Sequence, residues 1–366
     1  MTRRNFIAGS GAFGILALSG ASRARAADST DTGQFFLAGF RGTSVADLEV
    51  GRAQRLIERG DISGVILLER NIRSPEQLSR LIAALQSASP VLPAIIAIDQ
   101  EGGRVVRLGA QNGFRTWMSA QSISESGWGD QAIHDYFLAR ANELAAVGIN
   151  MNLAPVVDLN VNPANPIIGS KGRSFGQNVE QVIRFAQLFI QAHRAAGVKT
   201  CLKHFPGHGS SLDDSHHGSA DISETWSARE IAPFDRLAHA GMADSIMNGH
   251  LLNKYLSDEP WIPTSLSRAA VREVREGLGF DGIVVADDMQ MGAITKFTEP
   301  ASACIKAVEA GNSLLIYSNY RREHSIESTI EVSRSLREAV GSGKVSIDTI
   351  DAEVTRVRAF RGSLIG

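Results

Sequence analysis

The sequence predicts an α/β fold, a (β/α)8 TIM-type barrel that forms a single domain. Eight short apolar runs rich in β-forming residues recur along the chain, and segments with the spacing of amphipathic helices lie between them. Polar or ionisable residues stand at the ends of several runs, which is where barrels of this type place their active sites. Together these observations indicate a barrel with a functional site at the carboxyl ends of its strands.

The eight runs predict strands that are buried on both faces, because their apolar residues are nearly continuous rather than alternating. In chain order they occupy residues 34–40, 64–70, 92–99, 149–159, 198–205, 244–251, 282–288 and 312–318. An open doubly wound sheet is the alternative. Such a sheet would normally carry a glycine fingerprint after its first strand, and none follows Phe40.

The segment before the fifth run shows the helical pattern most clearly. Its apolar residues follow the three-and-four spacing of one helix face, and they are Val179, Val182, Ile183, Ala186 and Ile190. Gly197 is placed to end this helix. We find no Pro/Ser-rich linker and no low-complexity tract, so residues 27–366 are expected to form one domain.

The first 26 residues are expected to be a signal peptide of the twin-arginine type. Arg3 and Arg4 precede a weakly apolar run over residues 7–18, and Ala24-Arg25-Ala26 matches the small-x-small pattern of a cleavage site. A membrane anchor is the alternative, but the run is shorter than the roughly 20 residues of a spanning helix. The expected location is therefore periplasmic or secreted, with no stable membrane span after removal of the signal.

The composition is that of an ordinary globular protein. Hydrophobic residues make up 43% of the chain and the formal net charge is -2, which argues against nucleic acid as a partner. The two cysteines, Cys201 and Cys304, are too few for a disulfide framework. We expect both to be buried as small hydrophobic side chains.

Ionisable residues follow five of the predicted strands and form a candidate site. They are Asp99, Asp158, Lys203 with His204, His250, and Asp287 with Asp288. Each one alone could cap a helix or bond a strand end. Their joint occurrence at one rim of the barrel instead favours an active site.

The segment KHFPGHGSSLDDSHHG, residues 203–218, carries four histidines. A metal site from His204, His208, Asp214 and His216 is conceivable, although Pro206 and Gly207 exclude the helical arrangement of zinc proteases. A structural polar loop without chemistry is the second alternative. The third is proton transfer by Asp214 and His216, because a carboxylate can hold an imidazole in the tautomer that gives and retakes a proton. Asp213 and His217 form a competing pair.

Several motifs resemble glycoside hydrolase family 3, specifically its single-barrel β-N-acetylglucosaminidases, also called β-N-acetylhexosaminidases. They are KHFPGHG with DSH, IDQEGGRVVRL (98–108), GRSFG (172–176) and GFDGIVVADDMQMGAI (279–294). The resemblance runs in order from about residue 35 to residue 360 and implies the same barrel. The residue pattern does not show whether Asp287 or Asp288 is the nucleophile, and only the resemblance to the family motif distinguishes them.

The resemblance implies a role for each matching residue. Asp287 is expected to be the nucleophile, and His216 the acid/base with Asp214 as its partner. The substrate-binding residues implied are Asp99, Arg107, Arg173, Lys203 and His204, with His250 as a weaker candidate. An ion pair is the alternative for Arg107, and the three residues Ser170-Lys171-Gly172 make a longer join before Arg173 than the family pattern has.

The implied reaction is retaining exo-hydrolysis of terminal β-linked N-acetylglucosamine from peptidoglycan fragments or chitin-type oligosaccharides, without a metal or other cofactor. Most glycosidases use two carboxyl groups, and the distance between them distinguishes retaining from inverting enzymes. With a histidine as the acid/base this distance does not exist, so retention is implied by the resemblance alone. Within the family the alternatives are a β-glucosidase, a β-xylosidase or a glycoside phosphorylase. Outside it they are a metal-dependent hydrolase and an exported sugar-binding protein.

Overall fold

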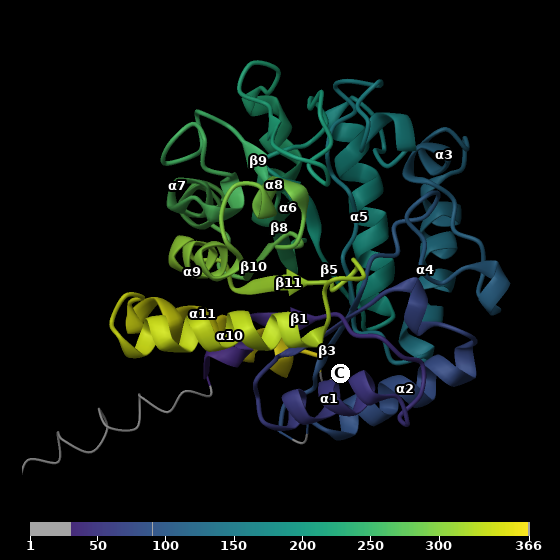
Figure 1. The fold of residues 1–366 in the computed structure, drawn as a ribbon. Helices are drawn as coiled ribbons and strands as arrows, with labels where there is room; N and C mark the ends of the chain where they lie inside the picture. Colours follow the sequence, from purple (N-terminus) through teal and green to yellow (C-terminus); the bar gives the residue numbers. More distant parts are fainter. Residues whose placement is uncertain (1–30, 90, 365–366) are drawn as a thin grey trace, which may run out of the picture.

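The computed structural model describes residues 31–89 and 91–364, so the predicted signal peptide, residues 1–26, lies outside the described residues. Within the described ranges a parallel sheet runs in the order β5-β4-β3-β2-β1-β11-β10-β8-β6 and is surrounded by helices (Figure 1). Its two outermost members, β5 (Lys199–Thr200) and β6 (Leu202–Phe205), are separated only by Cys201. The sheet therefore closes on itself, with β5 and β6 as two parts of one strand.

The remaining barrel strands are short, and all their pairings are parallel. They are β1 (Phe36–Ala38), β2 (Gly64–Leu67), β3 (Ile95–Ile98), β4 (Met151–Asn152), β8 (Ser245–Asn248), β10 (Ile283–Ala286) and β11 (Leu314–Tyr317). A separate small sheet pairs β7 (Ala220–Asp221) with β9 (Leu251–Leu252). Each of the eight predicted runs contains a barrel strand, so the (β/α)8 prediction is confirmed.

The helices lie outside the sheet (Figure 1). They are α1 (Leu48–Glu58), α2 (Pro75–Ser87), α3 (Ala120–Ser124), α4 (Asp130–Ala146), α5 (Val179–Ala195), α6 (Ala232–His239), α7 (Arg268–Arg272), α8 (Gly292–Thr295), α9 (Pro300–Ala310), α10 (Ile326–Gly341) and α11 (Ile347–Gly362). The helix predicted before the fifth run is α5, and Gly197 follows its end with φ at +76°. A positive φ is readily adopted by glycine, as expected beyond a helix terminus.

The fourth strand is shorter than its 11-residue apolar run suggests. Only Met151–Asn152 forms a regular ladder, and one isolated bridge joins Val156 to Lys203. Pro155 stands between these two parts and has no backbone N–H to donate, so it interrupts the ladder. The strand-end carboxylate Asp158 follows the isolated bridge.

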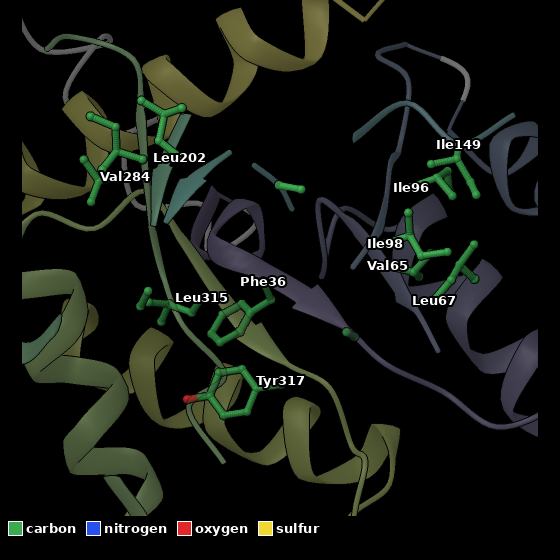
Figure 2. Packing of buried hydrophobic residues seen from close by; sticks show 14 of the residues in the cluster. Phe36, Val65, Leu67, Ile96, Ile98, Ile149, Leu202, Val284, Leu315 and Tyr317 are labelled. Atoms are coloured by element: carbon green, nitrogen blue, oxygen red, sulfur yellow. The ribbon is translucent and has the colours of Figure 1, made fainter. Parts of the chain in front are cut away.

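Two hydrophobic layers hold the barrel together, because alternate strand residues point to opposite faces of the sheet. Leu37, Ile66, Ile95, Met247 and Val285 belong to the cluster that fills the interior, which also contains Cys201. The other face packs against the helices, and Figure 2 shows Phe36, Val65, Leu67, Ile96, Ile98, Val284, Leu315 and Tyr317 of that layer. Packing on both faces of the sheet holds the strands in place, so that their carboxyl ends lie together at one rim of the barrel.

The two cysteines are buried, as expected, and they are not joined in a disulfide. Burial raises the pKa of each thiol to about 12. Among the described helices we find none with the length and apolar character needed to cross a membrane.

Candidate active site

A cavity of about 510 Å³ opens at the carboxyl ends of the barrel strands. Its apolar floor includes Ile66, Leu68, Met247 and Ile316. Its ionisable wall residues are Asp99, Arg107, Lys171, Asp214, His216, His217, Asp287, Asp288, Arg321 and His324. Five of the predicted site residues therefore meet in one cavity, namely Asp99, Arg107, Asp214, His216 and Asp287. Arg173, Lys203 and His204 lie behind this wall.

Asp287 and Asp288 directly follow β10, and their carboxyl groups have different surroundings. Burial alone would raise the pKa of the Asp287 carboxyl, but electrostatic attraction to His250 and His204 and the hydrogen bond from the Asp288 amide lower it to about 2. Burial raises the pKa of Asp288 to about 6 although its carboxyl accepts hydrogen bonds. Of these two adjacent carboxyl groups, Asp287 is therefore the one that stays ionised to lower pH.

The hydrogen bonds of Asp288 explain its place in the fold. Its Oδ1 accepts from the backbone N–H groups of Gln290 at 3.2 Å and Ser318 at 3.3 Å, and the Ser318 hydroxyl donates to Oδ2. These contacts connect the loop after β10 to the end of β11. Asp287 Oδ1 accepts the Asp288 amide at 2.8 Å.

His250 lies buried behind the two aspartates. Its Nε2 is 3.0 Å from the backbone carbonyl oxygen of Asp288, and its Nδ1 is 2.6 Å from the Ser265 hydroxyl. A carbonyl can only accept, so Nε2 carries a proton and the hydroxyl donates to Nδ1. Burial lowers the pKa of this imidazole, which fits a positioning residue that supports the Asp288 backbone.

Asp214 and His216 form the hydrogen-bonded pair predicted in the histidine loop. Asp214 Oδ1 accepts from His216 Nδ1 at 2.8 Å and from the His216 backbone N–H at 2.9 Å. Partial burial alone would raise the pKa of the Asp214 carboxyl, but these two hydrogen bonds lower it. The pairing places the proton on Nδ1 and leaves Nε2 as the ring atom that can serve a substrate.

The competing pair of the histidine loop is not formed. His217 Nε2 is 3.9 Å from Asp214 Oδ2, and 82% of its side chain is exposed. Asp213 is exposed as well. The loop therefore has Asp214 as the carboxylate nearest to both histidines, with a hydrogen bond to His216 only.

A contact between two loops holds His216 beside Asp287. The backbone carbonyls of Ser215 and His216 accept from the N–H groups of Ala293 and Gly292, both at 3.1 Å. A Cβ on Gly292 would lie 2.7 Å from the His216 carbonyl oxygen, so only glycine permits this approach. The start of α8 thereby anchors the histidine loop to the segment that carries Asp287.

Glu101 organises the basic residues behind the cavity, and the sequence analysis did not identify it. Its carboxylate accepts from Arg173 Nε at 2.7 Å and Nη2 at 2.8 Å, and lies 2.7 Å from Lys203 Nζ. Burial opposes its ionisation, but Arg173 and Lys203 hold its pKa well below the usual range. One indication of such an acid was present in the sequence. Arg107, Arg173 and Lys203 were all expected near one rim of the barrel, and a buried positive charge needs a negative partner.

Lys203 links Glu101 to the cavity wall. Its Nζ lies 2.7 Å from Asp99 Oδ1, and burial, which would lower the pKa of this ammonium, is outweighed by the two carboxylates, which raise it to about 12. Arg107 Nη2 lies 3.8 Å from Asp99 Oδ2. Asp99 thus faces the cavity with cations on two sides, while Arg173 is occupied by Glu101 and the Ile167 carbonyl.

His204 and His208 are positioned by Asp158. Asp158 Oδ2 lies 2.7 Å from His204 Nδ1, and Oδ1 accepts from the backbone N–H groups of His204 and His208. Burial lowers the pKa of His208 to about 4, and its Nε2 lies 3.0 Å from the Ser215 hydroxyl. Two of the four ligands of the alternative metal site, Asp214 and His216, are hydrogen-bonded to each other, and the other two, His204 and His208, are held by Asp158. No three His, Cys, Asp or Glu side chains converge as metal ligands in the described residues.

The loop after β11 adds wall residues that the sequence analysis missed. Tyr320, Arg321 and His324 line the cavity, and Arg41 Nη2 holds their backbone by donating to the carbonyls of Arg321 and His324. No local pattern marks these residues, because only closure of the barrel brings the last strand beside the first.

Comparison with known proteins gives the same family as the motifs. The glycosyl hydrolase family 3 N-terminal domain matches residues 43–360. A β-hexosaminidase of Tolumonas auensis is 35% identical over 73% of this chain and 79% of its own length. A β-hexosaminidase of Xylella fastidiosa is 31% identical over 87% of this chain and 94% of its own.

Solved structures share the barrel. A family 3 β-N-acetylglucosaminidase from Paenibacillus sp. has a TM-score of 0.84 at 34% identity, covering 93% of this chain and 63% of that one. A β-N-acetylhexosaminidase from Beutenbergia cavernae has a TM-score of 0.81 at 28% identity, covering 91% and 98%.

Some relatives are longer than this chain. It spans only 54% of β-hexosaminidase A of Pseudoalteromonas piscicida, to which it is 31% identical. The resemblance predicted from the motifs is confirmed by the matched domain and the shared fold, and the chain belongs to glycosyl hydrolase family 3.

Proposed function

We propose that the protein is an exported, retaining exo-glycosidase that hydrolyses terminal β-linked N-acetylglucosamine through a covalent glycosyl-enzyme. The observation that carries the proposal is that an ionised carboxylate, Asp287, and a carboxylate-held imidazole, His216, line the same cavity. The names of the relatives, β-hexosaminidase and β-N-acetylglucosaminidase, support this substrate class.

In the first step His216 donates the proton on Nε2 to the glycosidic oxygen while Asp287 attacks the anomeric carbon. The bond from that carbon to the leaving oxygen breaks with its electron pair, and a bond to an Asp287 oxygen forms. The lowered pKa of Asp287 keeps it ionised, as this role requires. Asp214 holds the proton on Nδ1 of the imidazole and stabilises its positive charge.

In the second step the neutral imidazole of His216 takes a proton from water, and the water oxygen attacks the anomeric carbon. The bond to Asp287 breaks, and the carboxylate and the protonated imidazole are both regenerated. Two displacements at one carbon leave its configuration unchanged, which is the retention proposed here.

Asp99 and Arg107 are proposed to bind the sugar directly, because both line the cavity wall. The Asp99 carboxylate accepts from sugar hydroxyls, and the Arg107 guanidinium donates to hydroxyls or the acetamido oxygen. Lys203 acts on the sugar through Asp99, and Arg173 through Glu101 and Lys203. His204 is held by Asp158 behind the wall and favours the ionised form of Asp287 electrostatically.

The place of action is proposed from the first 26 residues, whose twin-arginine pattern supports export to the periplasm or the medium. Substrates available there include peptidoglycan fragments and chitin-type oligosaccharides, and both carry the required β-linked N-acetylglucosamine.

The deciding experiment is release of nitrophenol from an aryl N-acetyl-β-glucosaminide and from an aryl β-glucoside, with chelator present. We expect turnover of the acetamido sugar alone, and loss of turnover in Asp287→Ala. Turnover that survives in this variant, or that the chelator abolishes, would overturn the proposal. Nuclear magnetic resonance of the first-formed sugar tests retention, and release of a sugar phosphate in phosphate buffer would reveal a phosphorylase instead.

A further inference from the structure

A hollow of about 190 Å³ lies among the outer helices of the barrel, and we call it the outer hollow. It is lined by the end of α1, by the turn that leads into β2, and by one face of α10. Its polar lining residues are Arg59, Asp61, Thr329, Ser333, Arg334 and Arg337. Within the described part of the chain it shares no lining residue with the active-site cavity, so it is a separate feature of the surface.

The charges of the outer hollow do not balance. Asp61 forms two ion pairs, because its Oδ2 lies 2.6 Å from Arg59 Nη2 and its Oδ1 lies 3.1 Å from Arg337 Nη2. Arg334 is exposed and forms no ion pair or hydrogen bond with any described residue. One carboxylate thus stands among three guanidinium groups, and two positive charges remain for an anion to neutralise.

Hydrogen-bond donors of α10 are left over in the same hollow. Ser333 is only 4% exposed, and its buried hydroxyl has no hydrogen-bond partner among the described atoms. The Nε–H group of Arg337 is likewise buried and without such a partner in the described residues. The buried Thr329 hydroxyl accepts from Asn319 Nδ2 at 3.1 Å, so its own proton remains available for donation. Buried donors in proteins nearly always have a partner, so these groups indicate a ligand that accepts hydrogen bonds.

The sequence of α10 explains why these donors lie together. Thr329, Ser333 and Arg337 are spaced four residues apart, and residues with this spacing lie on one face of a helix. The buried side chains of Leu56 and Ile62 supply apolar parts of the wall. Attraction between charges is stronger beside apolar walls than in open water, which favours an anion in this position.

We propose that the outer hollow binds a phosphate group, either as the inorganic ion or as the phosphoryl group of a larger molecule that extends into solvent. Guanidinium groups and hydroxyls donate well to phosphate oxygens, and a tetrahedral anion offers its oxygens to donors that approach from several directions. A water molecule in the liquid occupies roughly 30 Å³, so the hollow has room for one phosphate and a few waters. The inference is independent of the proposed function, because none of these residues takes part in the proposed reaction.

Calorimetric titration of the protein with inorganic phosphate tests the inference, in a chloride buffer whose ionic strength is held constant. We expect binding with a Kd below about 1 mM, and a rise in the unfolding temperature with phosphate concentration, because the ligand binds only the folded chain. Acetate is the comparison anion and should bind at least about tenfold more weakly, since a planar carboxylate offers fewer oxygens. No binding of phosphate, or equal binding of acetate, would overturn the inference.

Two variants assign the binding to the outer hollow. Ser333→Ala and Arg334→Gln each remove one donor to the anion, so each should raise the Kd for phosphate about fivefold or more and reduce the rise in unfolding temperature. Ser335→Ala is the matched control on the same helix, because the Ser335 hydroxyl donates to the Glu331 carbonyl outside the hollow. Arg272→Gln is the control for an exposed arginine elsewhere. Both controls should bind phosphate as the unaltered protein does.

Methyl phosphate distinguishes the two sources of the phosphate group. Tighter binding of inorganic phosphate identifies the free ion as the ligand, whereas equal or tighter binding of methyl phosphate identifies the phosphoryl group of a larger molecule; either result supports the site. Thermal unfolding without phosphate checks that Ser333→Ala and Arg334→Gln are folded. Phosphate affinity that is unchanged in both variants would place the anion elsewhere on the protein and would overturn the inference.

Discussion

Asp287 and Asp288 are adjacent in the chain, yet their carboxyl groups have pKa values shifted in opposite directions, to about 2 and to about 6. The cause is their surroundings. Both residues line the cavity, but Asp287 lies near His250, His204 and His216, whereas burial of the Asp288 carboxyl, together with the nearby charge of Asp287, outweighs its hydrogen bonds from Ser318 and Gln290. The end of β10 thus supplies an ionised carboxylate for the proposed reaction. It also supplies a second carboxyl group, whose hydrogen bonds hold the loop after β10 against the end of β11.

Asp287→Ala is expected to lower kcat by about 1000-fold or more, because no carboxylate remains to form the glycosyl-enzyme. Asp288→Asn should lose much less, since its amide oxygen can still accept the Gln290 and Ser318 N–H groups. Steady-state kinetics on an aryl glycoside compare the two variants. A larger loss in Asp288→Asn than in Asp287→Ala would reverse the assignment.

His216→Ala is expected to slow turnover most for substrates with poor leaving groups, because an activated aryl oxygen needs little protonation. A series of aryl glycosides of rising leaving-group pKa measures the slope of log kcat/KM. We expect a steeper slope in His216→Ala than in the unaltered protein. His217→Ala is the neighbouring control, and its slope should be unchanged because the His217 side chain forms no hydrogen bond with the Asp214 carboxylate. Equal losses across the series in His216→Ala would remove the acid role.

Gly292→Ala is expected to displace His216, because the new methyl group would lie 2.7 Å from the His216 carbonyl oxygen. The shift should lower kcat for a poor leaving group about tenfold or more, since small misplacements of catalytic groups are costly. Gly341→Ala is the matched control. A Cβ at Gly341, in the last turn of α10, meets no atom within 4 Å, so this variant should keep full activity. Unchanged kinetics in Gly292→Ala would show that the contact between the loops does not position His216.

Glu101→Gln is expected to lower the free energy of unfolding by about 3–5 kcal/mol, because it leaves Arg173 and Lys203 buried without their shared carboxylate. Urea unfolding at neutral pH measures the loss. Glu224→Gln removes an acid from an exposed pair with Lys254 and should leave the stability nearly unchanged. Similar values for the two variants would mean that the buried cluster does not stabilise the fold.

Asp288 is expected to make folding stability fall as the pH rises from about 4 to about 6. The pKa of an aspartate is ordinarily 3.8 and that of Asp288 is about 6 in the fold, so in this window the folded chain holds a proton that the unfolded chain has lost. The stabilisation present below pH 4 therefore disappears by the upper end of the window, a change on the order of 3 kcal/mol. Asp288→Asn removes this dependence, and its stability relative to the unaltered protein should rise across the window. A constant difference in urea unfolding between about pH 4.5 and about pH 6.5 would contradict the shift.

Much of the fold could be predicted from residue patterns. Eight apolar runs located the barrel strands, and the spacing from Val179 to Ile190 located α5, because burial on one or both faces imposes a period on the chain. The fourth strand was overestimated, since an apolar run does not reveal that Pro155 interrupts the ladder. The ends of the runs also identified most of the ionisable residues near the site.

The sequence by itself determined the barrel, the family and a set of candidate residues. The reason is that buried strands appear as apolar runs in the sequence, and the family motifs are short segments that occur in a fixed order. Tertiary structure alone decided the surroundings and the partners of those residues. It gave the Asp287 and Asp288 carboxyl groups different environments, gave Arg173 and Lys203 a buried partner in Glu101, and brought the loop after β11 beside the cavity. The physical reason is that the pKa of a carboxyl group and the pairing of a buried charge depend on atoms brought together in space by barrel closure, often from positions far apart in the chain.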